Sequence, residues 1–158
     1  MPFLRMRWIM LKLSCNIIVI LLLCACASTP KMIVKGMCKD YTAVTQSDAR
    51  HLAVIDALCH LAEYEGKQNS YDRDNYVFIE TRWQFGTIAL YREFKLDKSY
   101  KMISSLIEIF DNSKTICRIE NDKILFMSMN SDELLKKLKL KEKTFRTENN
   151  LLIVELVR

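Results

Sequence analysis

The stretch TQSDARHLAVIDALCHLAEYEG, from Thr45 to Gly66, decides the fold because it is the most strongly patterned segment of the chain. Thr45 or Ser47 can cap the start of a helix, and the spacing from Thr45 to Asp48 is that of a capping box. Gly66 stands where the end of a helix favours a left-handed residue. Apolar residues recur between these points at helical spacing, at Leu52, Ile55, Cys59 and Ala62, with Val54, Leu58 and Leu61 widening the stripe. The segment therefore predicts a long helix.

Alternating apolar and polar side chains predict strands on both sides of this helix. In the first of them, Met32, Val34 and Gly36 fall on one side. Gly86 permits a bend or bulge between two others, and the polar residues ENDK form the turn of a hairpin. The strands are predicted at residues 31–39, 76–85, 87–94, 115–119, 124–129 and 151–157.

The remaining segments complete the fold prediction. Residues 67–75 are polar and predict a loop, while residues 99–111 fit both a helix and a strand and favour the helix. Asn130 or Ser131 caps a last helix over 132–146, whose acids lie at its start and whose lysines lie towards its end. The sum is an α+β fold: a single small domain in which two or three helices pack on one face of a mixed or antiparallel sheet of about five strands.

An apolar run of eleven residues, Ile17 to Ala27, follows the basic start of the chain. It is shorter than the ~20 residues of a bilayer span and has the layout of a cleaved secretory signal. Within it, Leu23-Cys24-Ala25-Cys26 resembles the lipobox of bacterial lipoproteins. The resemblance implies that Cys26 becomes a lipid-modified N-terminus, and stable attachment takes two or more acyl chains such as palmitate.

The signal peptide and the lipid-modified cysteine determine the expected domain organisation. Residues 1–25 form a lipoprotein signal peptide, 26–31 a lipidated tether and 32–158 the α+β domain. An uncleaved single-pass anchor, or an ordinary signal cut near Ala25 or Ala27, is the alternative. Residue 27 is Ala rather than Asp, which by analogy with lipoprotein sorting in enteric bacteria favours the outer membrane over the inner one. The start codon, Met1 or Met10, stays open.

Charge is unevenly distributed along the chain. Removing Arg5, Arg7 and Lys12 from the 24 Lys and Arg leaves 21, against 19 Asp and Glu, for the part that begins at Cys26. This near balance argues against nucleic-acid binding.

Three cysteines follow the lipobox, and we interpret them as small buried hydrophobic residues. An exported protein lies where disulfides can form, so a bridge from Cys38 to Cys59 is the alternative, and Cys117 would then be left over.

No segment predicts catalysis, a metal or a cofactor. GMCKDY, residues 36–41, resembles the nucleophile segment of transglutaminase-like cysteine enzymes, with Cys38 as nucleophile. That chemistry needs a His base, and in that family it lies downstream, but no His follows His60. His51 and His60 are too far apart on the helix to share a metal, so each is interpreted as a surface or boundary residue, and Asp56 as a solvated or helix-boundary acid.

Two surface features suggest partners. The aromatic pair Tyr76 and Phe78 would mark a protein interface. The last helix carries a basic stripe that is either a solvated face or a surface for anionic lipid, envelope polysaccharide or an acidic protein. Its lysines are Lys136, Lys137, Lys139, Lys141 and Lys143.

Residues 33–66 also resemble a group of small bacterial envelope lipoproteins, typified by a twenty-kilodalton membrane-associated lipoprotein and by the N-terminal domain of a flagellar-assembly outer-membrane protein. The shared rhythm is carried by Ala49, Arg50, Ala53, Ala57, Leu61 and Ala62. The resemblance implies a non-catalytic role in packing or assembly in the envelope, without a cofactor.

We therefore expect a membrane-anchored bacterial lipoprotein with a non-catalytic binding or assembly role in the envelope. Two alternatives remain open: a small periplasmic hydrolase that uses Cys38, and a membrane-tethered accessory or immunity-type protein that binds an acidic partner through the 132–146 helix.

Overall fold

The computed structural model describes residues 32–39 and 41–158. The lipobox and Cys26 lie outside the described residues. The part from Met32 to Arg158 forms one compact unit.

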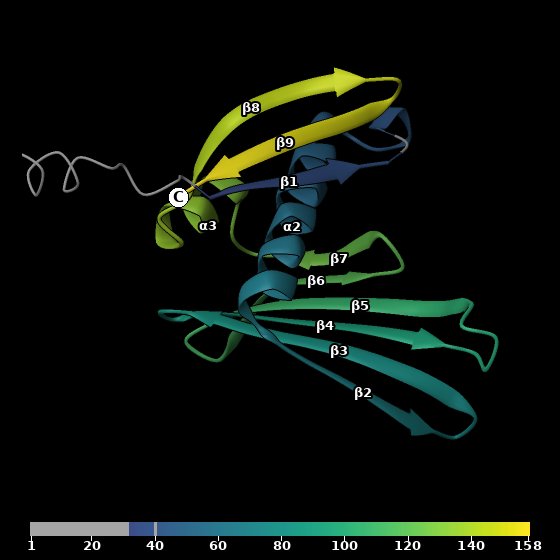
Figure 1. The fold of residues 1–158 in the computed structure, drawn as a ribbon. Coiled ribbons are helices and arrows are strands. Elements are labelled where there is room, and N and C mark those ends of the chain that lie inside the picture. The colour runs from purple at the N-terminus through teal and green to yellow at the C-terminus, as the bar shows by residue number, and fades with distance from the viewer. Residues whose placement is uncertain (1–31, 40) are drawn as a thin grey trace, which may run out of the picture. The chain divides into compact units, whose positions relative to one another are not determined.

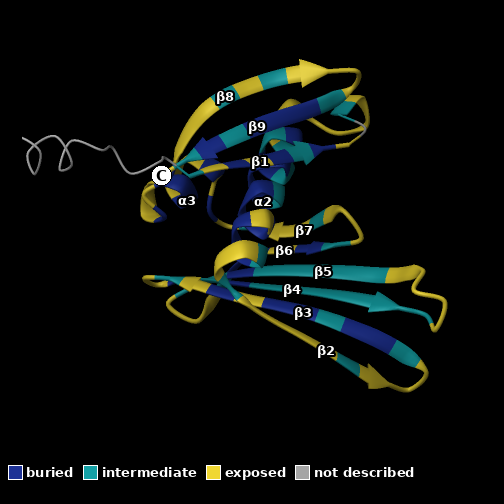
Figure 2. Cartoon of the chain, in the orientation of Figure 1, coloured by how far each residue is buried: buried dark blue, intermediate teal, exposed yellow. Residues whose placement is uncertain are grey.

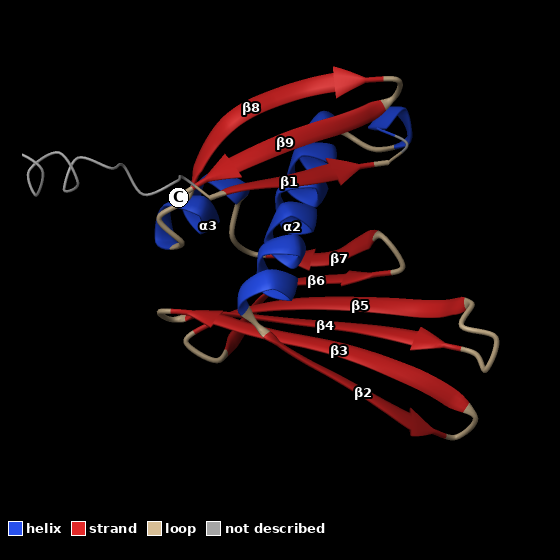
Figure 3. Ribbon diagram, in the orientation of Figure 1, coloured by secondary structure: helices blue, strands red, loops and turns tan. Residues whose placement is uncertain are grey.

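The described residues contain nine strands, two α-helices and a short 3-10 helix (Figure 3). The helices are η1 (Tyr41–Ala43), α2 (Gln46–Glu65) and α3 (Ser131–Lys137). The strands are β1 (Ile33–Cys38), β2 (Lys67–Arg73), β3 (Tyr76–Phe85), β4 (Ile88–Leu96), β5 (Met102–Asp111), β6 (Lys114–Glu120), β7 (Lys123–Met127), β8 (Lys141–Glu148) and β9 (Leu151–Val157).

The strands form two antiparallel sheets. The large sheet has six strands in the order β2-β3-β4-β5-β6-β7, so each strand lies beside its neighbour in sequence. The small sheet has three strands in the order β1-β9-β8, which brings the first and last strands together.

Helix α2 lies between the two sheets (Figure 1). On one side, the backbone of β1 touches it: a Cβ at Gly36 would lie 2.1 Å from the carbonyl oxygen of Ala53 and 2.2 Å from the nitrogen of Ala57. On the other side, His51 contacts Cys117 of β6 in the large sheet. Because a helix turns about 100° per residue, Ala53 and Ala57 lie on the opposite side of α2 from His51.

The central part of α2 is consequently buried around most of its circumference (Figure 2). Ala49, Ala53 and Ala57 have no exposed surface, and Ile55 and Leu58 on the remaining faces are almost completely closed off. One core, built on both sides of the helix, joins the two sheets.

Most of the predicted elements are confirmed. The α+β class is correct, and α2 begins after Thr45, whose hydroxyl accepts a hydrogen bond from the Asp48 amide as expected of a cap. Asn130 caps α3 in the same way, and β1, β3, β4, the β6–β7 hairpin and β9 lie where alternation predicts strands. In β1 the predicted inward residues Val34 and Gly36 are buried.

Other expectations were wrong. The structure has two sheets instead of one, and α2 is covered on two sides. Residues 67–75, expected as a loop, form polar edge strand β2 and its turn, and 99–111, expected as a helix, contains β5. Strand β5 pairs along its length with β4 and β6, and this tertiary pairing overrides the ambiguous local pattern.

The predicted helix over 132–146 is also corrected. Helix α3 ends at Lys137, Lys139 adopts a left-handed backbone with φ of 55°, and β8 begins at Lys141. Gly66 is not left-handed: its φ is −89°, and it is glycine because a Cβ would lie 2.4 Å from the Ala62 carbonyl oxygen.

Replacing Gly36 by Val should destabilise the protein by about 3 kcal/mol or more, since the added Cβ meets helix backbone that cannot rotate away. Urea unfolding gives the free energy of unfolding. Gly86→Ala is the matched control: Gly86 has φ of 59°, and a Cβ added there would have no atom within 4 Å. This control should lose only about 1 kcal/mol from backbone strain. Equal losses in the two variants would contradict the close packing of β1 on α2.

Candidate functional site

The five lysines singled out in the sequence do not share one helix. Lys136 and Lys137 belong to α3, Lys139 to the following turn, and Lys141 and Lys143 to β8. Lys137 forms an ion pair of 3.0 Å with Asp111 at the end of β5. The structure therefore spreads these charges over α3, β8 and the turn between them.

The cysteines and histidines are placed differently from an enzyme site. Cys38 and Cys59 are buried, and Cys59 is a free thiol, so the alternative Cys38–Cys59 bridge is not formed. His60 is partly exposed and lies near Asp56 and Glu63 on its own helix. Asp56 is more than a solvated acid, since its carboxylate accepts a hydrogen bond of 2.9 Å from the Met37 amide.

His51 is buried, in contrast to the expectation of a surface or boundary residue. Its Nδ1 lies 2.8 Å from the Ser131 hydroxyl oxygen, and its Nε2 lies 3.6 Å from the Cys117 sulfur. Burial lowers the pKa of His51 to about 4, a tendency that Asp48 opposes and Arg50 reinforces. Burial likewise raises the pKa of Cys117 to about 11.

This Cys–His–Ser arrangement has the order of a catalytic triad but not its chemistry. A thiol nucleophile needs a thiolate and a base that can hold its proton. Here the imidazole is neutral, the thiol is protonated, and all three side chains are closed to solvent. We interpret the cluster as a structural link between α2, α3 and β6.

Neither a metal site nor a membrane-spanning helix is found in the part of the chain that the structure describes. Residues 32–39 and 41–158 contain no group of three or more His, Cys, Asp or Glu side chains arranged to hold a metal ion. Within the same residues, no helix has the length and apolar character needed to cross a bilayer.

The face of the large sheet turned away from α2, here called the outer face, has no described element packed against it (Figure 1). Strand register assigns its residues, because alternate side chains of each strand point to it. From one end to the other it carries Arg73, Tyr76, Tyr71, Phe78, Lys95, Glu80, Glu93, Arg82, Tyr91, Glu108, Arg118, Phe126, Gln84, Ala89 and Phe110.

Glu80 lies at the centre of a hydrogen-bond network on this face. The hydroxyls of Tyr71 and Tyr91 donate to its carboxylate at 2.9 and 3.0 Å, and Arg82 forms an ion pair with it at 3.1 Å. Tyr91 also donates to Glu93 at 2.8 Å. Burial alone would raise the pKa of Glu80, but the two tyrosines and Arg82 outweigh it and lower that pKa.

The network therefore fixes side chains in place. A carboxylate held by three donors stays ionised and holds each donor in one orientation. Burial, together with the Glu93 and Glu80 carboxylates, raises the pKa of Tyr91, so its hydroxyl stays a donor.

Aromatic rings and cations form the end of the outer face near the β2–β3 turn. Tyr71 and Phe78 stack with ring centroids 5.3 Å apart, and the Arg73 guanidinium lies 4.7 Å from the Phe78 ring. The Lys95 ammonium lies 3.8 Å from the Tyr76 ring. Tyr76 is half-buried and Phe78 is buried, so the aromatic pair predicted from the sequence is only partly open to a partner.

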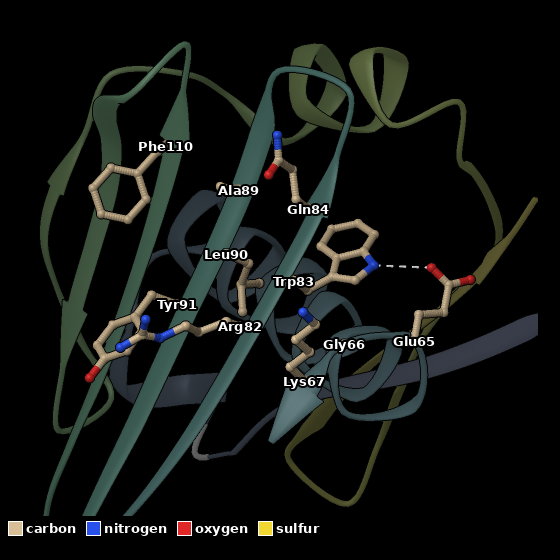
Figure 4. A pocket seen from close by; sticks show the side chains of 10 residues that line it. All are labelled: Glu65, Gly66, Lys67, Arg82, Trp83, Gln84, Ala89, Leu90, Tyr91 and Phe110. Carbon is tan, nitrogen blue, oxygen red and sulfur yellow. Dashed lines mark hydrogen bonds between the residues drawn. The ribbon is translucent and has the colours of Figure 1, made fainter. Parts of the chain in front are cut away.

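A pocket of about 700 Å³ opens at the other end, where β2 begins beside β3 (Figure 4). The small side chain of Ala89 leaves a hollow that is bordered by Arg82, Gln84, Tyr91 and Phe110. A second hollow of about 490 Å³ shares Gln84, Ala89 and Phe110 and continues to the β5–β6 turn. Both volumes lie in the range of ligand and side-chain binding sites.

The pocket also extends to the α2-facing side at the edge of the sheet, where Glu65 at the end of α2 and Trp83 line it. The Trp83 indole donates a hydrogen bond of 3.0 Å to Glu65, as Figure 4 shows, and Arg158 forms an ion pair with the same carboxylate at 2.8 Å. Arg158 also lies 5.2 Å from the Phe85 ring. Arg158, which follows β9 of the small sheet, therefore stabilises the rim of this pocket in the large sheet.

No protein-family model, curated protein or solved structure matches this chain.

The buried His51 should make the protein less stable in mild acid. Its pKa is lowered from 6.5 to about 4 by folding, so the unfolded chain binds the proton more strongly between these values. Stability should fall as the pH drops through this window, by on the order of 1 kcal/mol per pH unit. Urea unfolding at several pH values above about 5, where carboxylates stay ionised, measures the slope.

Two variants assign that slope to a residue. His51→Gln should remove most of the pH dependence of the free energy of unfolding. His60→Gln, which changes the exposed histidine of the same helix, should not alter it. A slope that survives His51→Gln would show that another group titrates.

Proposed function

We propose that this protein is a lipid-anchored component of the bacterial envelope that binds another envelope protein, without catalysis, through the outer face of its large sheet. Cys26 carries the lipid, and the outer membrane is the favoured location. No nucleic acid or cofactor takes part in this role.

The composition and rigidity of the outer face carry the proposal. Protein interfaces are enriched in Tyr, Phe and Arg, and their strongest contacts come from such residues held in place before binding. The outer face presents Tyr71, Tyr91 and Arg82 around one ionised carboxylate, and Phe110 beside an open pocket. A partner side chain could enter the pocket at reduced cost in conformational entropy, since Arg82 and Tyr91 at its border are already held by Glu80.

The charges of this face also favour a folded protein over a polyanion. Arg82 is paired with Glu80, and Arg118 is paired with Glu108 and Glu120. Alternating charges of both signs select a complementary surface and determine its register, while adding modestly to affinity.

The buried chemistry supports binding more than catalysis. Cys117 and His51, a Cys–His pair in direct contact, are closed to solvent and uncharged. Cys38, the nucleophile of the alternative hydrolase, is buried, and both nitrogens of His51 are engaged elsewhere. No observation therefore favours the hydrolase.

The resemblance of residues 33–66 to small envelope lipoproteins supports the same role. The alanines of that rhythm now have a physical reason, because Ala53 and Ala57 admit the backbone of Gly36 against the helix. The accessory-protein alternative retains its exposed lysines but loses the continuous basic helix on which it depended.

The lipid anchor predicts a specific mass. Protein extracted from membranes should have the mass of residues 26–158 plus acyl chains, and the Cys26→Ala variant should lack this lipidated species. Intact-mass spectrometry measures both. A full-length, unmodified wild-type chain would contradict the anchor.

The binding face predicts where a partner touches the protein. A photo-reactive phenylalanine analogue placed at Phe126 or Arg82 should cross-link one discrete envelope protein in living cells. Both side chains are accessible, since Phe126 is 46% exposed and the Arg82 side chain 70% exposed.

Tyr64 on α2 gives the matched control, because it is 79% exposed but not on the outer face. The analogue at this position should not yield the same product. Identical products from Tyr64 and Phe126, or none from the outer face, would contradict the assignment of the binding face.

A further inference from the structure

The chain enters the described domain at one end of the small sheet, and lysines gather at that end. Ile33 pairs with Val157, and Val157 pairs with Lys141 on its other side. Ile33 at the start of β1 and Lys141 at the start of β8 therefore lie on either side of Val157 in the small sheet. Lys139 lies two residues before Lys141, on the exposed turn from α3.

The small sheet presents Ile33, Val157 and Lys141 on its face away from α2. Val34, Gly36 and Cys38 are the buried side of β1, so Ile33 and Lys35 point the other way. Ile33 is 49% exposed, and Lys35, Lys139, Lys141 and Lys143 are all exposed. We call this surface the lysine face; it consists of Ile33, Lys35, Lys141, Lys143, Glu155 and Val157 of the sheet, with Lys139 in the turn before β8.

Most of its positive charge is uncompensated. Lys35, Lys139 and Lys141 form no ion pair with any residue of the described ranges, and Lys143 reaches Glu155 only at 3.8 Å. Glu155 is shared with Arg146, which lies closer to it at 3.2 Å. The lysine face thus combines an apolar centre, the exposed Ile33 and the half-buried Val157, with a surplus of ammonium groups.

The length of the preceding chain limits how far this surface can lie from a membrane. Five residues separate Cys26 from Met32, and the six Cα–Cα steps between them span at most about 3.5 Å each in an extended chain, or roughly 20 Å in all. Under the proposed lipidation of Cys26, the start of β1 cannot lie farther than this from the lipid headgroups. At that range a lysine-rich surface is attracted to anionic lipids, by about 1 kcal/mol for each lysine that reaches the headgroups.

We propose that the lysine face is a membrane-docking surface that binds the phosphates of anionic phospholipids and so orients the anchored domain. The ammonium groups contact phosphate, and Ile33 and Val157 lie against the interfacial region. Because α2 separates the two sheets, the outer face of the large sheet is then turned away from the bilayer towards its partner. This inference rests on the lipid anchor of the proposed function.

Residue-resolved acylation of lysines tests the orientation. The lipidated protein is inserted into vesicles of phosphatidylcholine alone or of phosphatidylcholine with phosphatidylglycerol, and a brief pulse of an uncharged acetylating reagent is read by mass spectrometry. Lys35, Lys139 and Lys141 should react about fivefold more slowly in the anionic vesicles. Lys114 and Lys123 of the large sheet should change little, and about 0.5 M salt should remove the difference by screening.

Charge-reversal variants provide the matched comparison. Lys139→Glu with Lys141→Glu should abolish the protection of Lys35 and Lys143, whereas Lys114→Glu with Lys123→Glu, which changes the net charge equally, should preserve it. The docking surface would be contradicted if the lysines of vesicle-bound protein reacted at equal rates in both kinds of vesicle. That result would not contradict the lipid anchor. Protein that does not float with the vesicles would overturn the anchor and, with it, this inference.

Discussion

The contact of the Gly36 backbone with the helix at Ala53 and Ala57 is the constraint on which the rest of the structure depends. A side chain at any of these three positions that was larger than the one present would lift β1 away from α2. Strand β1 joins the small sheet only through β9, so the close approach also sets the position of β9 and β8. Larger side chains on the opposite side of the helix, among them Ile55 and Leu58, support the large sheet. The helix is therefore the element to which both sheets are attached.

Much of this fold follows from local patterns in the sequence, and the errors have a common cause. Helix α2, its cap and the strands with an apolar face were predictable because each carries its own signal. Strands β2 and β8 are polar edge strands without an alternating apolar face, and β5 depends on the neighbours that flank it. One further signal lies in the sequence. Val54, Leu58 and Leu61 widen the apolar stripe of α2 to about half of the helix. Ala49, Ala53 and Ala57 occupy most of the remaining circumference, which indicates burial on two sides.

The candidate site was less predictable than the fold because its residues meet only through strand register. Glu80, Tyr91 and Arg82 show no recognisable motif, and a shift of one residue between β3 and β4 would place Tyr91 on the buried side. The aromatic pair on β3 was visible in the sequence, but the arginine and the second tyrosine that complete the surface were not. The lysines could be identified by composition, whereas their place beside the first strand follows from the pairing of β1, β9 and β8.

The order of strands also has a consequence for the timing of folding. Each hairpin of the large sheet can form as soon as its two strands have been synthesised, because its contacts are local. Strand β1, although made first, has no neighbour to pair with until β9 follows at the other end of the described chain. Under the export proposed above, the small sheet can therefore close only after β9 has followed β1 across the membrane.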